Sequence, residues 1–162
     1  KAIVLSPSPH QLDRIAAELD QQRLTCSRQL QIEASLAQHC HLVLTQNLSE
    51  AARFSNAYAP EHLGLSVADP DALLTEIRHA GAVFLGHYSP EAVGDYSAGS
   101  NHVLPTLGSA RFQSPLGVYD FQRRMNVVHY DQKALLADLS LIRTIATEEG
   151  LYAHERAATI RF

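Results

Sequence analysis

The sequence lacks the features of several protein classes. Its 13 Lys and Arg residues form no dense run and the formal net charge is −4, so nucleic-acid binding through phosphate neutralisation is not expected. No apolar run reaches the roughly 20 residues that a membrane-spanning helix needs. The first residues also lack the charged-then-apolar pattern of a signal peptide. We therefore expect neither a nucleic acid nor a membrane as a partner.

Cysteines and nucleotide-binding motifs are also scarce. The two cysteines, Cys26 and Cys40, form no close motif, which fits a reducing, cytoplasmic compartment. Neither G-x-G-x-x-G nor G-x-x-x-x-G-K-[ST] occurs, so the chain has no phosphate loop of its own. The H-E-x-x-H helix motif is absent too, which makes a general zinc hydrolase a weak hypothesis.

What is present is an alternation of strand-like and helix-like segments. With 46% apolar and 19% charged residues, the chain has the composition of an ordinary globular domain. A cap residue followed by Pro, or by Glu or Gln three positions on, predicts helix starts at Ser8, Asn47, Asp69 and Ser89. A further helix is expected over residues 28–38, and strands over 2–5, 41–45, 63–67 and 82–85. This order predicts an α/β fold, a parallel sheet flanked by helices.

The C-terminal part has a different character. A Gly-, Ser- and Pro-containing loop region covers 97–117, and a helical stripe follows the cap candidate Asp131 and ends at Gly150. We expect an α/β part over 1–116 and a small helical tail over 117–162. A tail of about 45 residues is too small to fold alone, so it should pack on the main domain or on another subunit.

Four acid–base side chains between Ala59 and Thr106 are candidates for a functional site: Glu61, His62, Asp95 and His102. A carboxylate beside an imidazole can move protons near pH 7, and an Asp and a His on a Gly-rich loop can hold a divalent metal. Each also has a plainer interpretation. Glu61 and His62 can be exposed residues of a helix-ending turn, the Gly-Asp dipeptide a simple turn, and His102 a packing residue.

Glu149 and His154 form a second candidate pair near the C-terminus. They are five residues apart and point to nearby faces only if the chain bends at Gly150. The plainer alternative is a surface helix with scattered charges.

Five stretches combine these candidate residues with Gly and Pro: N-A-Y-A-P-E-H-L at 56–63, H-A-G-A-V-F-L-G at 79–86, S-P-E-A-V-G-D-Y-S-A-G-S-N-H-V-L-P-T at 89–106, Y-D-F-Q-R-R-M at 119–125 and E-G-L-Y-A-H-E-R-A at 149–157. Together they resemble the histidinol dehydrogenase family. The likeness is dense from residue 55 to 162 and weaker but collinear before that. It implies an incomplete Rossmann-like or aldehyde-dehydrogenase-like sheet.

The resemblance implies oxidation of L-histidinol to L-histidine through histidinaldehyde, with two NAD⁺ and with zinc, in the last steps of histidine biosynthesis. His62 would take the proton of the alcohol, and Glu61 would activate the water that attacks the aldehyde-level intermediate. Asp95 and His154 match zinc ligands. His62, Asp95, His102, Glu149 and His154 match residues that contact the substrate, which zinc chiefly positions.

The same resemblance implies a longer polypeptide. The family has a preceding portion that binds NAD and supplies a Gln and a His as further zinc ligands, and its tail crosses to the partner subunit of a homodimer. The chain also enters a strand-like run at Lys1, which we interpret as part of a longer chain. On its own it should be inactive. The alternative is a non-catalytic dimerisation or ligand-binding fragment without the NAD-binding portion.

Overall fold

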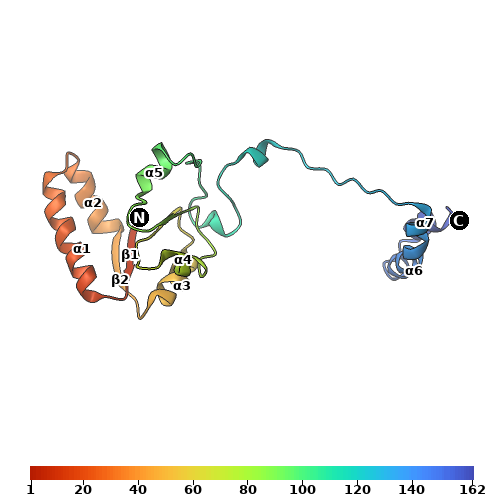
Figure 1. The fold of residues 1–162 in the computed structure, drawn as a ribbon, viewed down its shortest axis with the longest axis horizontal. Helices are drawn as coiled ribbons and strands as arrows, with labels where there is room; N and C mark the ends of the chain where they lie inside the picture. Colours follow the sequence, from red (N-terminus) through yellow and green to blue (C-terminus); the bar gives the residue numbers. More distant parts are fainter. The chain divides into compact units, whose positions relative to one another are not determined.

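The computed structural model describes all residues, Lys1–Phe162, as two compact units, which are Lys1–Phe121 and Gln122–Phe162 (Figure 1). The first unit contains the strands β1 (Ala2–Ser6), β2 (Cys40–Leu44), β3 (His62–Leu65) and β4 (Ala82–Leu85), and the helices α1 (Pro9–Gln22), α2 (Gln29–His39), α3 (Leu48–Tyr58), α4 (Pro70–Leu74) and α5 (Glu91–Tyr96). The second contains α6 (Gln132–Glu148) and α7 (Tyr152–Thr159). The expected boundary lay after residue 116, whereas the short 3₁₀ turn Val118–Phe121 belongs to the first unit.

The predicted α/β fold with parallel strands between helices is confirmed, but the strands form two pairs. β1 pairs with β2 in parallel, and β3 pairs with β4 in parallel. No hydrogen bond joins the two pairs, so β1 and β3 each keep one free edge. Helix α1 packs on β1 and β2, while α3 contacts both β1 and α4 and so lies between the two pairs (Figure 1).

Local cap chemistry sets three of the helix starts. Ser8, Asn47 and Asp69 each accept a hydrogen bond from the backbone N–H three residues on, at 3.2, 2.8 and 3.0 Å. These three predictions are confirmed. The fourth prediction is confirmed for the position of the helix but wrong for its cap: α5 begins at Glu91, directly after the extended Pro90, and no side chain caps it.

The β3–β4 pair has two chemically different faces, because successive side chains of a strand alternate. The residues Leu63, Leu65, Val83 and Leu85 belong to the apolar core together with Ala52 of α3 and Leu73 of α4. The alternation places His62, Gly64, Ala82 and Phe84 on the opposite face. Because the four apolar residues are packed in the core, His62, Gly64, Ala82 and Phe84 face away from it.

A left-handed residue ends α3 just before the Glu61–His62 segment. Ala59 has φ 54° and is buried, and its N–H donates to Ser55 O at 2.7 Å. The Arg111 guanidinium donates to the carbonyl oxygens of Ala57 and Gly108, a favourable place for a cation because the helix C-terminus carries partial negative charge. The chain is thus held where it turns from α3 into β3.

The second unit is a helical hairpin. Asp131 caps α6 by accepting from Ala134 N at 2.7 Å, as predicted. Gly150, at φ 71°, ends α6: its N–H donates to Thr147 O, and Leu151 N donates to Ala146 O. This pair of bonds is the Schellman motif. An ion pair at 3.1 Å from Arg143 to Glu155 joins the two helices.

The Tyr130 hydroxyl donates to Asp138 Oδ2 at 2.8 Å, and this bond and the carboxylate charge raise the pKa of Tyr130 above its ordinary value. No helix of the chain has both the length and the apolar character that crossing a membrane requires.

Candidate functional site

His62 lies at the start of β3, on the face of the β3–β4 pair that is opposite the apolar core. Its ring lies 6.1 Å from the Phe84 ring, centroid to centroid, with an angle of 26° between the planes. Its Nε2 lies 3.7 Å from Glu91 Oε1, and the His62 side chain is 27% exposed. The Phe84 ring and the Glu91 carboxylate therefore restrict the His62 imidazole from two directions. Its exposed part remains accessible to a substrate.

Helix α5 lies against the same face because one of its residues has no side chain. A Cβ at Gly94 would stand 2.8 Å from Phe84 Cε1, so a larger residue there would require the Phe84 ring or α5 to shift. The next residue, Asp95, is exposed, and its carboxylate has no hydrogen-bond or ion-pair partner in the chain. Asp95 thus directly follows the residue of α5 that packs on Phe84, on the same short helix as Glu91, the neighbour of His62.

Glu61 is positioned mainly through its backbone. Its carbonyl oxygen accepts from Ala82 N at 2.8 Å, and the carbonyl of Pro60 accepts from Gly81 N at 2.9 Å. The side chain of Glu61 is half-buried, and its carboxylate makes neither an ion pair nor a hydrogen bond. The carboxylate is therefore free to accept a proton from water or from a substrate.

The loop that carries His102 is anchored beside Glu61. Pro105 is buried, and its Cδ lies 3.2 Å from the position that a Cβ on Gly81 would take. Asn101 Oδ1 accepts from Val103 N at 2.8 Å, which forms a tight turn around His102. His102 itself is exposed. The Glu61 backbone, Gly81 and the His102 loop therefore form one packed junction.

Glu149 and His154 belong to the second unit. Glu149 is the last residue of the α6 cap and His154 lies in the first turn of α7, with the left-handed Gly150 between them. The bend that the sequence required for the two side chains to face one region is present. Both residues are exposed, and neither side chain has a hydrogen-bond partner.

The chain holds no group of three or more His, Cys, Asp and Glu side chains placed for a metal ion. A carboxylate and an imidazole are suitable zinc ligands in type, and both Asp95 and His154 are exposed and unpaired. Because zinc requires at least three protein ligands, neither residue is surrounded by enough donors in its own unit to hold the ion.

Two residues near His62 were not predicted from the sequence. Both lie in stretches quoted for the family resemblance, and Phe84 also in a predicted apolar strand, but neither was a candidate site residue. The alternation of strand side chains could have placed Phe84 on the His62 face, once the register of β3 and β4 was known. Nothing local in the sequence connects Glu91 with His62.

The chain is similar to known proteins over its whole length. A family model described as histidinol dehydrogenase matches residues 1–162. Histidinol dehydrogenase of Chromobacterium violaceum is 48% identical over 161 residues, and that of Dechloromonas aromatica 45% identical over 161 residues. Each alignment covers 99% of this chain and 37% of the relative.

A solved structure gives the same result. The crystal structure of histidinol dehydrogenase from Elizabethkingia anophelis superimposes with a TM-score of 0.90 at 30% identity, covering 98% of this chain and 36% of that one. The chain thus spans between a third and two fifths of the length of these relatives. Since the family model matches it from end to end, the chain belongs to the histidinol dehydrogenase family.

Proposed function

We propose that this chain works within a longer polypeptide that oxidises L-histidinol to L-histidine with two NAD⁺. The observation that carries the proposal is the packing around His62: its ring stacks on Phe84, its Nε2 lies 3.7 Å from Glu91 Oε1, and the backbone of the preceding Glu61 is hydrogen-bonded to Ala82. A half-open imidazole with an unpaired carboxylate on the preceding residue provides two bases for two successive deprotonations. Membership of the family names the substrate.

In this proposal His62 is the general base for the alcohol. It removes the hydroxyl proton as hydride passes from the carbinol carbon to NAD⁺, which gives the aldehyde, NADH and a proton. Glu61 deprotonates the water that adds to the aldehyde carbon. Loss of a second hydride to a second NAD⁺ then gives the carboxylate. Each positioned base typically contributes about 10²–10⁴-fold in rate.

Asp95 and His154 are proposed as ligands of zinc, which when bound holds the imidazole and amine of the substrate in place. His102 and Glu149 contact the substrate from the loop and from the tail. The ligands that this chain lacks, and the main NAD⁺ contacts, come from the remaining part of the polypeptide. The two cysteines are unpaired, and Cys26 is exposed, which supports placing the enzyme in the cytoplasm.

The direct test is NADH production from L-histidinol by the complete, zinc-loaded polypeptide. We expect His62→Asn and Glu61→Gln each to lower kcat by at least about a hundredfold. The matched controls His10→Asn and Glu18→Gln change exposed groups of α1 and should keep wild-type turnover. A fully metallated wild-type protein without turnover would reject the enzyme and favour the non-catalytic fragment.

A second test addresses the proposed homodimer with an exchanged tail. If each site combines His62 of one subunit with His154 of the other, inactive His62→Asn and His154→Asn proteins should complement each other. After subunit mixing, half of the dimers are mixed and each has one intact site, so activity should return to about a quarter of wild type. Mixtures that stay inactive would show that each site is built within one subunit.

A further inference from the structure

The side chain of Asn56, in the last turn of α3, makes three hydrogen bonds to one backbone segment. Its Nδ2 donates to Glu76 O at 2.8 Å, and its Oδ1 accepts from Arg78 N at 2.7 Å and from His79 N at 3.2 Å. All three partners lie in residues 75–81, the α4–β4 connection. No other side-chain amide of the chain makes more than one hydrogen bond, so this contact needs an explanation of its own.

The Asn56 amide bonds the connection in the way that a neighbouring strand would. In a parallel ladder, one residue donates to the carbonyl before its partner and accepts from the N–H after it. The amide does the same around Ile77, between Glu76 O and Arg78 N. Residues 77–80 have no regular secondary structure, and no backbone group bonds these positions. Asn56 therefore supplies the hydrogen bonds that the chain lacks just before β4 begins.

The end of α3 and the α4–β4 connection form a closed ring, made of residues 56–61 and 78–82. At one end the ring is closed by the bonds of Asn56. At the other end it is closed by the Glu61 carbonyl, which accepts from Ala82 N at 2.8 Å. The two proposed bases stand at this second end. A shift of the connection at the first end would thus change the backbone pairing that carries them.

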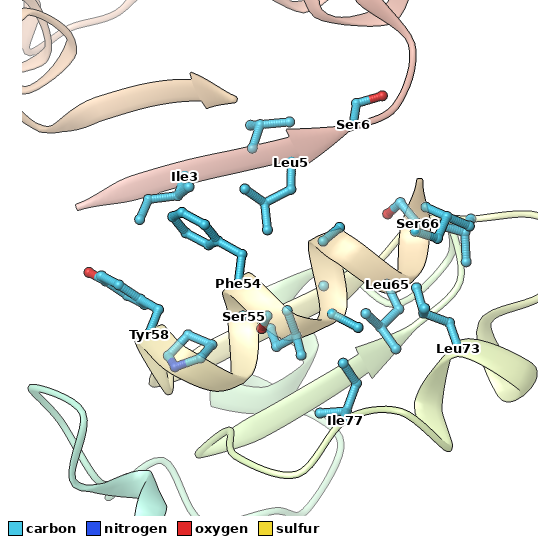
Figure 2. Close-up of a pocket in the computed structure, with 18 of the residues that line it drawn as sticks. Ile3, Leu5, Ser6, Phe54, Ser55, Tyr58, Leu65, Ser66, Leu73 and Ile77 are labelled. Carbon is cyan, nitrogen blue, oxygen red and sulfur yellow. The ribbon is translucent and has the colours of Figure 1, made fainter. Parts of the chain in front are cut away.

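Other contacts between α3 and the connection do not fix its backbone in the same way. Ser49, in the first turn of α3, donates to Glu76 Oε1 at 3.0 Å, which joins two side chains only. Ile77 packs on the apolar core cluster. Figure 2 shows Phe54 and Tyr58 pointing toward β1, away from Ile77, so α3 uses different faces for β1 and for the connection. Only the Asn56 bonds hold the main chain of the connection.

We propose that Asn56 is a positioning residue for the two bases, Glu61 and His62. A side-chain amide exchanges no proton near pH 7, so Asn56 acts only through the backbone that it holds. The kinetic part of the inference rests on the proposed function. The structural part, that Asn56 sets the pairing of Glu61 with Ala82, requires no catalysis. A separate structural measurement therefore distinguishes its failure from a failure of the enzymatic proposal.

The kinetic test is Asn56→Ala in the complete, zinc-loaded polypeptide. A shift of about 1 Å in a catalytic group can cost about 10²-fold, so kcat per bound zinc should fall at least about tenfold. The KM for L-histidinol should stay within about twofold, because the proposed zinc ligands Asp95 and His154 lie outside the ring. Counting enzyme by bound zinc excludes a fall that comes only from unfolded protein.

Two control variants separate positioning from general loss of stability. Ser49→Ala removes a bond between the same helix and the same connection, far from Glu61. Ser8→Ala removes the cap of α1 and destabilises the same unit elsewhere. Both should keep the wild-type kcat per bound zinc. An unchanged kcat in Asn56→Ala, or an equal fall in either control, would overturn the proposal.

Hydrogen exchange tests the structural part without turnover. In the wild-type polypeptide the amides of Arg78 and His79 should exchange at least about tenfold more slowly than unbonded exposed amides. In Asn56→Ala, the amides of Gly81 and Ala82, which bond Pro60 O and Glu61 O, should exchange at least about tenfold faster than in wild type.

The Thr45 amide is the internal reference for this measurement. It donates to Ser6 O at 3.0 Å in the other strand pair and should exchange at the wild-type rate in Asn56→Ala. Unchanged exchange at Gly81 and Ala82 would overturn the proposal whatever the activity. If Asn56→Ala does not fold, fast exchange at Arg78 and His79 in wild type would still overturn it. A wild-type polypeptide without turnover would reject only the enzymatic proposal.

Discussion

Replacement of Gly81 by alanine should damage both the stability of the fold and the positioning of the proposed base. A Cβ at Gly81 would lie 2.5 Å from the Glu61 carbonyl oxygen and 3.2 Å from Pro105 Cδ. Neither a backbone carbonyl nor a proline ring can rotate away as a flexible side chain would. The β3 entry and the His102 loop would have to move apart by most of an ångström.

The size of the effect follows from this geometry. Adding a methyl group to a well-packed site costs about 1–3 kcal/mol, so the urea midpoint of the complete polypeptide should fall with an unchanged m-value. Turnover should fall more steeply, because a shift of about 1 Å in a catalytic group can cost about 10²-fold. Steady-state NADH production under native conditions measures the second effect separately from the first.

Gly64→Ala is the matched control, on the same strand pair and two residues from His62. A Cβ at Gly64 meets no atom within 4 Å, and its backbone is not left-handed. Because glycine in a strand costs about 0.5–1 kcal/mol relative to alanine, this variant should be as stable as wild type or slightly more so. Wild-type stability and turnover in Gly81→Ala, or equal damage in Gly64→Ala, would refute the reasoning.

Three smaller perturbations follow from single contacts. Glu91→Gln should lower kcat/KM by up to about fivefold, since a carboxylate close to an imidazole is worth up to about 1 kcal/mol once the imidazole has taken a proton. An unchanged kcat/KM would show that the Glu91 contact with His62 does not contribute. Asp131→Ala should lower the free energy of unfolding by about 0.5–2 kcal/mol and Asp131→Asn by little, because Asn still caps α6; equal losses in urea melts would contradict this. Asp138→Asn should lower the titration midpoint of Tyr130 seen by ultraviolet absorbance. In wild type the raised pKa means that the Tyr130–Asp138 bond stabilises fully below pH 10.0 and is lost as pH rises through the raised value; identical titrations of wild type and variant would contradict it.

The parts of the fold that the sequence predicted are those set by local chemistry. A cap residue and the N–H group that it accepts from are three positions apart, so Ser8, Asn47 and Asp69 could be read directly. For α5 the same reasoning gave the right place but the wrong cap, Ser89. There Pro90 is extended, with ψ 152°, and is itself the cap, so Ser89 lies one residue too early to reach a free N–H of α5.

The pairing of the strands could not be predicted in this way, because it depends on residues that are far apart in the sequence. Apolar runs identified the four strands, but nothing within a run says which neighbour it pairs with, and the separation into two pairs emerged only from the structure. The contact between His62 and Glu91 is of this kind. It depends on how closely α5 approaches β4, which Gly94 permits and Phe84 limits.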